Sequence, residues 1–301
     1  MKYLSLFTGI GGFELGIQNA YEQNTTDEHE RPSVRKGHIR DTEGRGEREL
    51  PTCIGYSEID KYACSIYQRH FPDHYNHGDI TLINEKELPD FDLLVGGFPC
   101  QSFSIAGKRG GFNDTRGTLF FDIARIIREK QPRLLLLENV KGLLSHDNGA
   151  TFRTIIATLD ELGYDCQWQV LNSKNHGVPQ NRERVFIVGN SRGTRRPEVF
   201  PFGDTDTKSI KSKNNAGVQR QPHRRENITD LNGMLKYFRE ASGGYQQQKP
   251  PRLRRLTPTE CERLQGFKDG WTEGVSDTQR YKTLGNAVTT NVIEAIISRM
   301  L

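Results

Sequence analysis

The chain contains few of the residues on which metal sites, disulfide frameworks and membrane spans depend. Only 5 of its 301 residues are cysteine, 3 are methionine and 2 are tryptophan. The cysteines are scattered, odd in number and never in a Cys-x-x-Cys pair, so neither a zinc site nor a disulfide framework is indicated. No apolar run approaches the roughly 20 residues of a membrane-spanning helix, and the opening residues lack the pattern of a signal peptide. We therefore expect a cytoplasmic protein with reduced thiols, no bound metal and no membrane partner.

The charge of the chain is weakly basic, with a formal net charge of +4 and a pI near 8.7. Hydrophobic residues make up 34% of the sequence and charged residues 27%, which fits a globular protein with a substantial core. Basic residues gather between Arg182 and Arg255. A solvated loop and a surface that faces a polyanion explain this cluster equally well.

Short apolar runs that suit buried strands alternate with segments of helical periodicity. The expected strands are residues 1–7, 53–57, 79–80, 91–95, 134–137, 164–171 and 185–188. The expected helices are residues 13–20, 61–70, 118–130, 151–162, 258–265 and 288–301. This alternation predicts an α/β fold built on a Rossmann-like, doubly wound sheet that is mostly parallel.

Two polar stretches interrupt this pattern. Residues 21–52 contain almost no apolar side chains, so they predict a flexible surface insertion. Residues 189–251 are rich in Ser, Asn, Gly, Arg and Gln and predict a second, small module. The expected organisation is a main domain over residues 1–188, the small module, and a return to the main domain over residues 252–301.

A glycine turn and two acidic residues follow the first three expected strands. The turn contains Gly9, Gly11 and Gly12, which let the backbone bend sharply and approach a ligand closely. Glu58 follows the second strand, where nucleotide-binding folds place an acid on the ribose hydroxyls. Asp79 ends the next strand and suits an adenine amino group. A turn that is merely structural and ordinary surface carboxylates remain alternatives.

Cys100 lies in the segment Gly96–Ser104, directly after an apolar run. A strand that leads into glycine, proline and cysteine presents that cysteine at the carboxyl edge of the sheet, where open α/β folds place reactive groups. Lone free cysteines are more often inert core residues. Glu138 ends the four-leucine run of residues 134–137, so burial is expected to raise its pKa. The alternative is that Glu138 caps a turn.

These segments, in this order, resemble the motifs of the cytosine-C5 DNA methyltransferases. The resemblance covers most of the chain and rests on the glycine turn and on Pro99-Cys100, Glu138-Asn139-Val140, Gln180–Arg184, Arg255–Phe267 and Tyr281–Val288. It implies S-adenosylmethionine as the cofactor, S-adenosylhomocysteine as its product, and transfer of a methyl group to C5 of cytosine in double-stranded DNA. In this chemistry a thiolate adds to C6 of a base that has been flipped out of the duplex.

The resemblance also assigns roles to residues. It makes Cys100 the nucleophile, Glu138 the group that holds or donates a proton at ring N3, and Arg184 the contact of the pyrimidine oxygen, with Arg182 in support. The implied cofactor pocket consists of Phe7, Gly9, Gly11, Gly12, Glu58, Ile59, Asp79, Ile80, Pro99, Leu119, Asn286 and Ala287. Simple surface arginines remain an alternative for residues 182 and 184.

The small module of residues 189–251 is short for target recognition in this family. A targeting-deficient relative, which binds cofactor and nucleic acid without turnover, and a cytosine-C5 RNA methyltransferase are therefore alternatives to the DNA enzyme. We expect a monomer that acts alone or beside a cognate restriction endonuclease.

Overall fold

The computed structural model of the chain describes residues 1–29, 50–99, 119–203 and 254–301. The chain divides into two compact units. One is formed by Met1–Lys208 together with Thr257–Leu301, and the other by Ser209–Leu256. The sheet, the helices and the candidate site described below all belong to the first unit.

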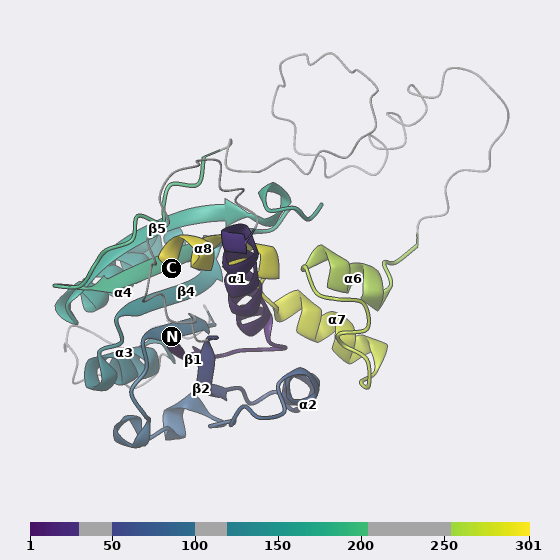
Figure 1. Ribbon diagram of the computed structural model, residues 1–301, viewed down its shortest axis with the longest axis horizontal. Helices are drawn as coiled ribbons and strands as arrows, with labels where there is room; N and C mark the ends of the chain where they lie inside the picture. Colours follow the sequence, from purple (N-terminus) through teal and green to yellow (C-terminus); the bar gives the residue numbers. More distant parts are fainter. Residues whose placement is uncertain (30–49, 100–118, 204–253) are drawn as a thin grey trace, which may run out of the picture. The chain divides into compact units, whose positions relative to one another are not determined.

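The first unit is built on one six-stranded sheet, whose strand order is β2-β1-β3-β4-β6-β5 (Figure 1). The strands are β1 (Lys2–Leu6), β2 (Thr52–Ser57), β3 (Leu93–Gly97), β4 (Leu134–Val140), β5 (Tyr164–Asn172) and β6 (Glu183–Ser191). Strands β2, β1, β3 and β4 are parallel, whereas β6 is antiparallel to both of its neighbours. The expected mostly parallel, Rossmann-like sheet is confirmed, with one reversed strand.

Helices cover both faces of this sheet, as the term doubly wound requires. The α-helices are α1 (Gly12–His29), α2 (Lys61–His70), α3 (Leu119–Lys130), α4 (Ala150–Glu161), α6 (Pro258–Leu264), α7 (Asp277–Asn286) and α8 (Thr290–Met300). The 3-10 helices are η1 (Ile80–Leu82), η2 (Glu85–Glu87), η5 (Lys141–Leu144), η6 (His146–Gly149) and η7 (Ser173–Asn175). Leu135 and Leu137 of β4 pack with Ile123 of α3. Leu134 and Leu136 point to the opposite face, where α1 and α8 lie side by side (Figure 1).

A third apolar cluster joins α2 to the C-terminal helices. It contains Tyr67 of α2, Trp271 from the segment after α6, and Leu284 of α7. The indole N–H of Trp271 donates to the carbonyl oxygen of Ile10 at 2.8 Å, and its ring stacks on His70 with centroids 3.6 Å apart. This packing brings α6 and α7 against the glycine turn that follows β1.

Two expected elements are wrong near the start of the chain. Residues 79–80 do not form a strand, because Asp79 instead caps η1 through a hydrogen bond from the backbone of Thr81. The expected loop from residue 21 to 52 is helical as far as His29 and already part of β2 at Thr52. Tyr21 continues the apolar face of α1 and is buried in the core beside α8, so the helix does not stop at Ala20. Residues 30–49 of that expected insertion lie outside the described residues.

The small module does not begin at Gly189. β6 continues to Ser191, and Val199 and Phe200 are buried in the core cluster that contains α8. Gln167 and Gln169 of β5 hold the following segment: their side-chain amides bond to backbone groups of residues 197–202. Residues 189–203 are therefore part of the first unit, and residues 204–251 of the expected module lie outside the described residues.

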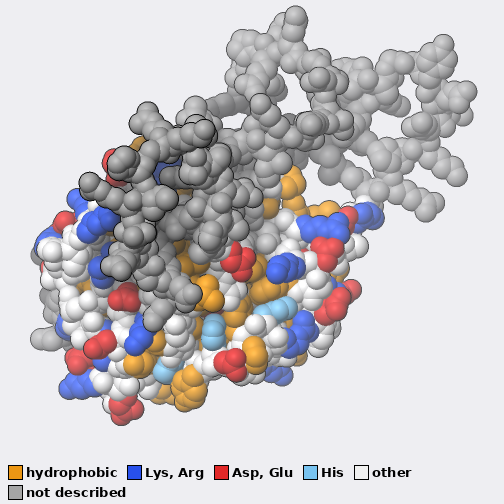
Figure 2. All heavy atoms as spheres, in the orientation of Figure 1, with side chains coloured by type: hydrophobic (Ala, Val, Ile, Leu, Met, Phe, Trp, Pro, Cys, Tyr) orange, Lys and Arg blue, Asp and Glu red, His pale blue; other side chains and the backbone are white. Residues whose placement is uncertain are grey.

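The described surface carries mixed charge. On the face shown in Figure 2, acidic and basic side chains are interspersed. The described ranges contain no helix that is long and apolar enough to cross a membrane. Nor do three or more His, Cys, Asp or Glu side chains in those ranges gather in a way that suits a metal ion.

Candidate active site

One carboxylate joins the turn after β1 to the end of β2. The N–H of Gly9 donates to Oε2 of Glu58 at 2.9 Å, while Oε1 accepts the N–H groups of Ile59 at 2.9 Å and Asp60 at 2.8 Å. Gly9 has a left-handed φ of +61°, and a Cβ at this position would meet no described atom within 4 Å. A carboxylate oxygen has room for two hydrogen bonds, and Oε2 accepts one from the described residues. Glu58 therefore keeps acceptor capacity at Oε2, beside an open stretch of backbone.

The other two glycines of the turn have a packing role. A Cβ on Gly11 would lie 2.5 Å from Cε2 of Phe71, and one on Gly12 would lie 2.7 Å from Cγ2 of Val288. Neither neighbour has room to withdraw, because both Phe71 and Val288 are buried. Packing explains these two glycines, and Gly9 is the one whose surroundings leave space for a ligand.

A hollow of about 660 Å³ lies beside Glu58, between the exposed side of α2 and the segment of Asn76 and Gly78. Ile59 lines it with a side chain that is 73% exposed, which is unusual for isoleucine. Asn76, which sequence reasoning did not single out, fixes this wall: its Oδ1 accepts the N–H of Glu58 at 3.3 Å and its Nδ2 donates to the carbonyl of Glu58 at 3.1 Å. An exposed aliphatic side chain next to an oriented carboxylate suits a nucleoside, whose base is apolar on its face and whose ribose donates hydrogen bonds.

Four other residues of the expected cofactor pocket do not line this hollow. Oδ1 of Asp79 accepts both the N–H and the hydroxyl of Thr81 at 2.9 Å. Ile80 is only 3% exposed and packs within the core, so its side chain does not line the hollow. Phe7 and Leu119 are half-buried against the same core cluster.

The end of β3 leads toward the expected nucleophile. Cys100 itself lies outside the described residues, and Pro99 is exposed directly before it. The buried side chain of Asn139, at the end of β4, donates from Nδ2 to the carbonyl oxygen of Phe98 at 2.8 Å and accepts the N–H of Val140 at 2.8 Å. Asn139 is therefore a positioning group for the start of the cysteine loop. Only its place beside Glu138 in the sequence hinted at a role.

Glu138 and Arg184 meet at the same edge of the sheet. Because β6 runs antiparallel to β4, the start of β6 lies beside the end of β4, and Arg184 pairs with Val140 in the register. Nε of Arg184 lies 3.0 Å from Oε1 of Glu138, whose residue is 8% exposed. Burial raises the pKa of Glu138 above its usual range, and the positive charges of Arg184 and Arg182 oppose that rise. The pair is thus a carboxyl that is able to carry a proton beside a fixed cation.

Arg182 points to the C-terminal segment rather than to Glu138. Its Nη1 donates to the carbonyl oxygen of Gly285 at 3.1 Å and its Nη2 to that of Ala287 at 2.8 Å. Asn286 stands between these two residues at the end of α7 and is exposed, whereas Ala287 is buried. The structure therefore brings Arg182, Asn286 and Ala287 together, although they lie about 100 residues apart in the chain.

Comparisons with known proteins give one consistent result. The family model described as C-5 cytosine-specific DNA methylase matches residues 1–237 and 207–301 of this chain. The chain is 39% identical to the Type II methyltransferase M1.ScrFI of Lactococcus lactis subsp. cremoris, over 100% of its own length and 78% of that protein. It is 33% identical to the Type II methyltransferase M.HhaI of Haemophilus parahaemolyticus, over 98% of its own length and 93% of that protein.

Solved structures share the fold at lower sequence identity. The S. pombe Dnmt2 methyltransferase superposes with a TM-score of 0.66 at 18% identity, covering 99% of this chain and 97% of that one. A putative DNA modification methyltransferase encoded within a prophage of E. coli gives a TM-score of 0.63 at 19% identity, covering 100% of this chain and 98% of that one. At this level of identity, these structures support the fold alone.

Proposed function

Because the chain belongs to the C-5 cytosine-specific DNA methylase family and is a DNA cytosine-C5 methyltransferase, we propose that Cys100, Glu138 and Arg184 act on its pyrimidine. The observation that carries this proposal is the ion pair of the buried Glu138 with Arg184 at the carboxyl edge of the sheet. Asn139, the next residue, holds the carbonyl of Phe98 two residues before Cys100. The alternatives of a targeting-deficient relative and of an RNA enzyme gain no support from the comparisons.

Each of the three residues has one role in the assigned chemistry. The thiolate of Cys100 forms a bond to C6 of cytosine, and the electron pair of the C5–C6 double bond becomes available at C5. Glu138, with its raised pKa, holds a proton at ring N3, and Arg184 donates hydrogen bonds to the pyrimidine oxygen. After C5 has gained a methyl group it loses its own proton to a base. The C6–S bond then breaks and returns the thiolate.

The cofactor we assign is S-adenosylmethionine, which supplies an electrophilic methyl group and leaves as S-adenosylhomocysteine. Glu58 would accept hydrogen bonds from the ribose hydroxyls, and the exposed side chain of Ile59 would cover the adenine face. The open backbone at Gly9 and its hydrogen bond to the carboxylate of Glu58 support this assignment. Of the assigned residues, Glu58 and Ile59 line the hollow. The resemblance of their motifs assigns Asp79 to the adenine amino group and Asn286 to the rest of the cofactor.

The substrate is DNA, and the target cytosine has to leave the stack to reach Cys100. We infer that the small unit, Ser209–Leu256, carries target recognition, on the basis of its place in the chain and its basic residues. We further infer a monomeric, cytoplasmic enzyme that requires no metal and acts alone or beside a cognate restriction endonuclease.

A covalent trap tests the proposal. Duplex DNA that carries 5-fluorocytosine should form a denaturation-resistant adduct with the wild-type chain when cofactor is present, because fluorine at C5 blocks release. Cys100→Ser should form no adduct and transfer no methyl group, while it binds S-adenosylhomocysteine normally. Cys166→Ser is a matched control, since this half-buried cysteine packs against the core, and it should form the adduct as the wild type does. An adduct with Cys100→Ser would remove Cys100 from the mechanism.

A further inference from the structure

The guanidinium of Arg182 bridges two carbonyl groups that flank Asn286. Its two terminal nitrogens donate to Gly285 at 3.1 Å and to Ala287 at 2.8 Å. A planar guanidinium presents two parallel donors in a fixed fork, whereas a lysine ammonium is a single point charge. The fork therefore fixes the backbone on both sides of Asn286, and lysine cannot reproduce this arrangement.

The backbone of Arg182 is itself anchored to the sheet. Its N–H donates to Oδ1 of Asn172 at 3.1 Å, and its carbonyl oxygen accepts the N–H of Ser173 at 3.0 Å. Burial and the neighbouring charge of Arg184 lower the pKa of Arg182 to about 10, so the group stays charged at neutral pH. Arg182 is thus a rigid link from the start of β6 to the end of α7.

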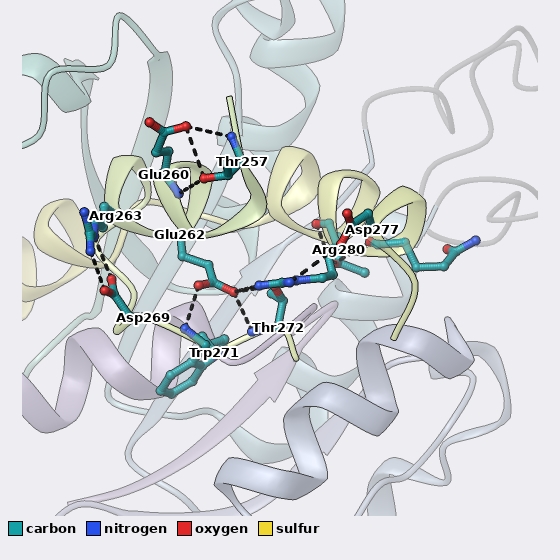
Figure 3. A network of polar contacts seen from close by, with 12 residues as sticks. Thr257, Glu260, Glu262, Arg263, Asp269, Trp271, Thr272, Asp277 and Arg280 are labelled. Atoms are coloured by element: carbon teal, nitrogen blue, oxygen red, sulfur yellow. Dashed lines mark hydrogen bonds and ion pairs between the residues drawn. The ribbon is translucent and has the colours of Figure 1, made fainter. Parts of the chain in front are cut away.

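The rest of α7 is held by other contacts. Figure 3 shows the buried carboxylate of Glu262, from α6, which pairs with Nη2 of Arg280 in α7 at 3.0 Å. The same carboxylate accepts the N–H groups of Gly270 and Thr272, each at 2.8 Å. Lys282, one turn before the end of α7, donates to Oδ2 of Asp60 at 2.6 Å. Loss of the Arg182 fork should therefore release the last turn of α7 without displacing the helix.

We propose that Arg182 is a positioning residue that holds Asn286 toward the cofactor, and that it does not act on the pyrimidine. This inference deepens the proposed function, because it depends on Asn286 being part of the cofactor pocket. Arg184, only two residues away, faces Glu138 on the base side. The two arginines would then serve different substrates: Arg184, in β6, the cytosine, and Arg182, directly before β6, the methyl donor.

A double-mutant cycle tests this assignment by calorimetry with S-adenosylhomocysteine in the absence of DNA. Arg182→Lys and Asn286→Ala should each raise the Kd for S-adenosylhomocysteine about tenfold, which is the size of effect expected when a charge-assisted hydrogen bond is lost. If Arg182 acts through Asn286, the double variant should be no weaker than Asn286→Ala alone. Losses that multiply in the double variant would overturn the inference.

Steady-state kinetics separate the two arginines. Arg182→Lys should raise KM for S-adenosylmethionine about tenfold and leave kcat at saturating cofactor within about threefold of the wild type. Arg184→Lys should do the reverse, with a kcat at least about a hundredfold lower and an unchanged cofactor Kd. If Arg182→Lys instead lost as much kcat as Arg184→Lys and kept normal cofactor affinity, Arg182 would be assigned to the pyrimidine and the inference would be wrong.

A surface variant and the wild type complete the design. Arg263→Ala, in α6, removes an exposed ion pair with Asp269, and it should match the wild type in every measurement. A wild-type chain that binds no S-adenosylhomocysteine would overturn the proposed function and, with it, this inference. If the wild type binds S-adenosylhomocysteine but the two substitutions of the double-mutant cycle act independently, the inference is wrong and the proposed function stands.

Discussion

At the scale of single residues, Glu138 is subject to two opposing effects. Burial raises its pKa above the ordinary value of 4.5, and Arg184 at 3.0 Å pulls it down again. Burial is the larger effect, so the protonated form persists to higher pH than it does for an exposed glutamate. A carboxyl in this condition is able to hold a proton at a ring nitrogen and to give it up.

The pH profile of kcat/KM should therefore decline on its alkaline side as Glu138 loses its proton. In Glu138→Gln, which keeps a donor but does not ionise, kcat should fall about 10²-fold and this alkaline decline should disappear. The exposed neighbour Glu183 provides a control, since Glu183→Gln should leave the profile unchanged. Persistence of the same decline in Glu138→Gln would assign the ionisation to another group.

Asn139 should matter for the nucleophile loop and not for the cofactor. In Asn139→Ala the carbonyl of Phe98 loses the hydrogen bond from the side chain of residue 139, which should lower the free energy of unfolding by about 1–3 kcal/mol and slow adduct formation with 5-fluorocytosine DNA. The Kd for S-adenosylhomocysteine should stay within about twofold. Asn84→Ala, at the exposed cap of η2, is a control for lost stability alone. A normal rate of adduct formation in Asn139→Ala would show that the loop does not depend on this bond.

At the scale of elements, the Glu262–Arg280 pair fixes α7 against α6. Burial raises the pKa of Glu262, but the hydrogen bonds from Thr272 and the pairing with Arg280 outweigh it, so the pKa in the folded state lies below 4.5. An unfolded glutamate then binds protons more readily than the folded one. The stabilisation is consequently complete above about pH 4.5 and is lost as the pH falls through the lower, folded value.

Glu262→Gln should lower the free energy of unfolding at pH 7 by about 1–3 kcal/mol, because Arg280 then loses its buried counter-charge and keeps only the exposed Asp277 at 3.6 Å. The difference in Tm between this variant and the wild type should shrink as the pH falls below about 4.5. Asp269→Asn disrupts the exposed pair that Asp269 forms with Arg263 of α6, and it should leave the Tm close to that of the wild type. A Tm difference that does not change with pH would mean that the charge of Glu262 is not what holds α7.

The sequence predicts elements well where local signals coincide. Helix α2 has the expected bounds, because Asp60 caps its first turn and its apolar residues recur with helical spacing. Helix α6 begins at Pro258 after a capping box formed by Thr257 and Glu260, which Figure 3 shows. By contrast, Asp79 follows a segment that forms only an isolated bridge between Tyr56 and Asn76, so the expected strand lacked a partner.

The candidate site is less predictable, because its geometry depends on tertiary contacts. Glu138 and Arg184 could be named from their motifs, but their pairing depends on the reversal of β6, which periodicity does not reveal. Asn76 supports Glu58 from 18 residues away without any local pattern. Helix α7 was not expected, since its buried residues are few and tertiary contacts rather than an apolar stripe hold it.

At the scale of the whole molecule, the proposed cofactor pocket draws on distant parts of the chain, from Gly9 and Glu58 to Asn286. A ligand that binds only the folded state should therefore stabilise the first unit as a whole. S-adenosylhomocysteine at about 100 times its Kd should raise the Tm by roughly 5–10 °C. Glu58→Ala should reduce this shift at the same ligand concentration. An unchanged shift in Glu58→Ala would mean that the pocket lies elsewhere.

The packing of α1 against α8 has a consequence for the order in which the protein is made. α1 ends at His29 and its partner begins at Thr290, so the ribosome completes the first helix long before it completes the second. At ordinary elongation rates the interval is roughly 15–50 s. During that time the sheet covers part of α1, but the side that packs on α8, at Gly16 beside Ile293, lacks its partner. A nascent chain arrested at residue 285 should therefore remain open to proteolysis in α1, and resistance at that length would show that another segment shields it first.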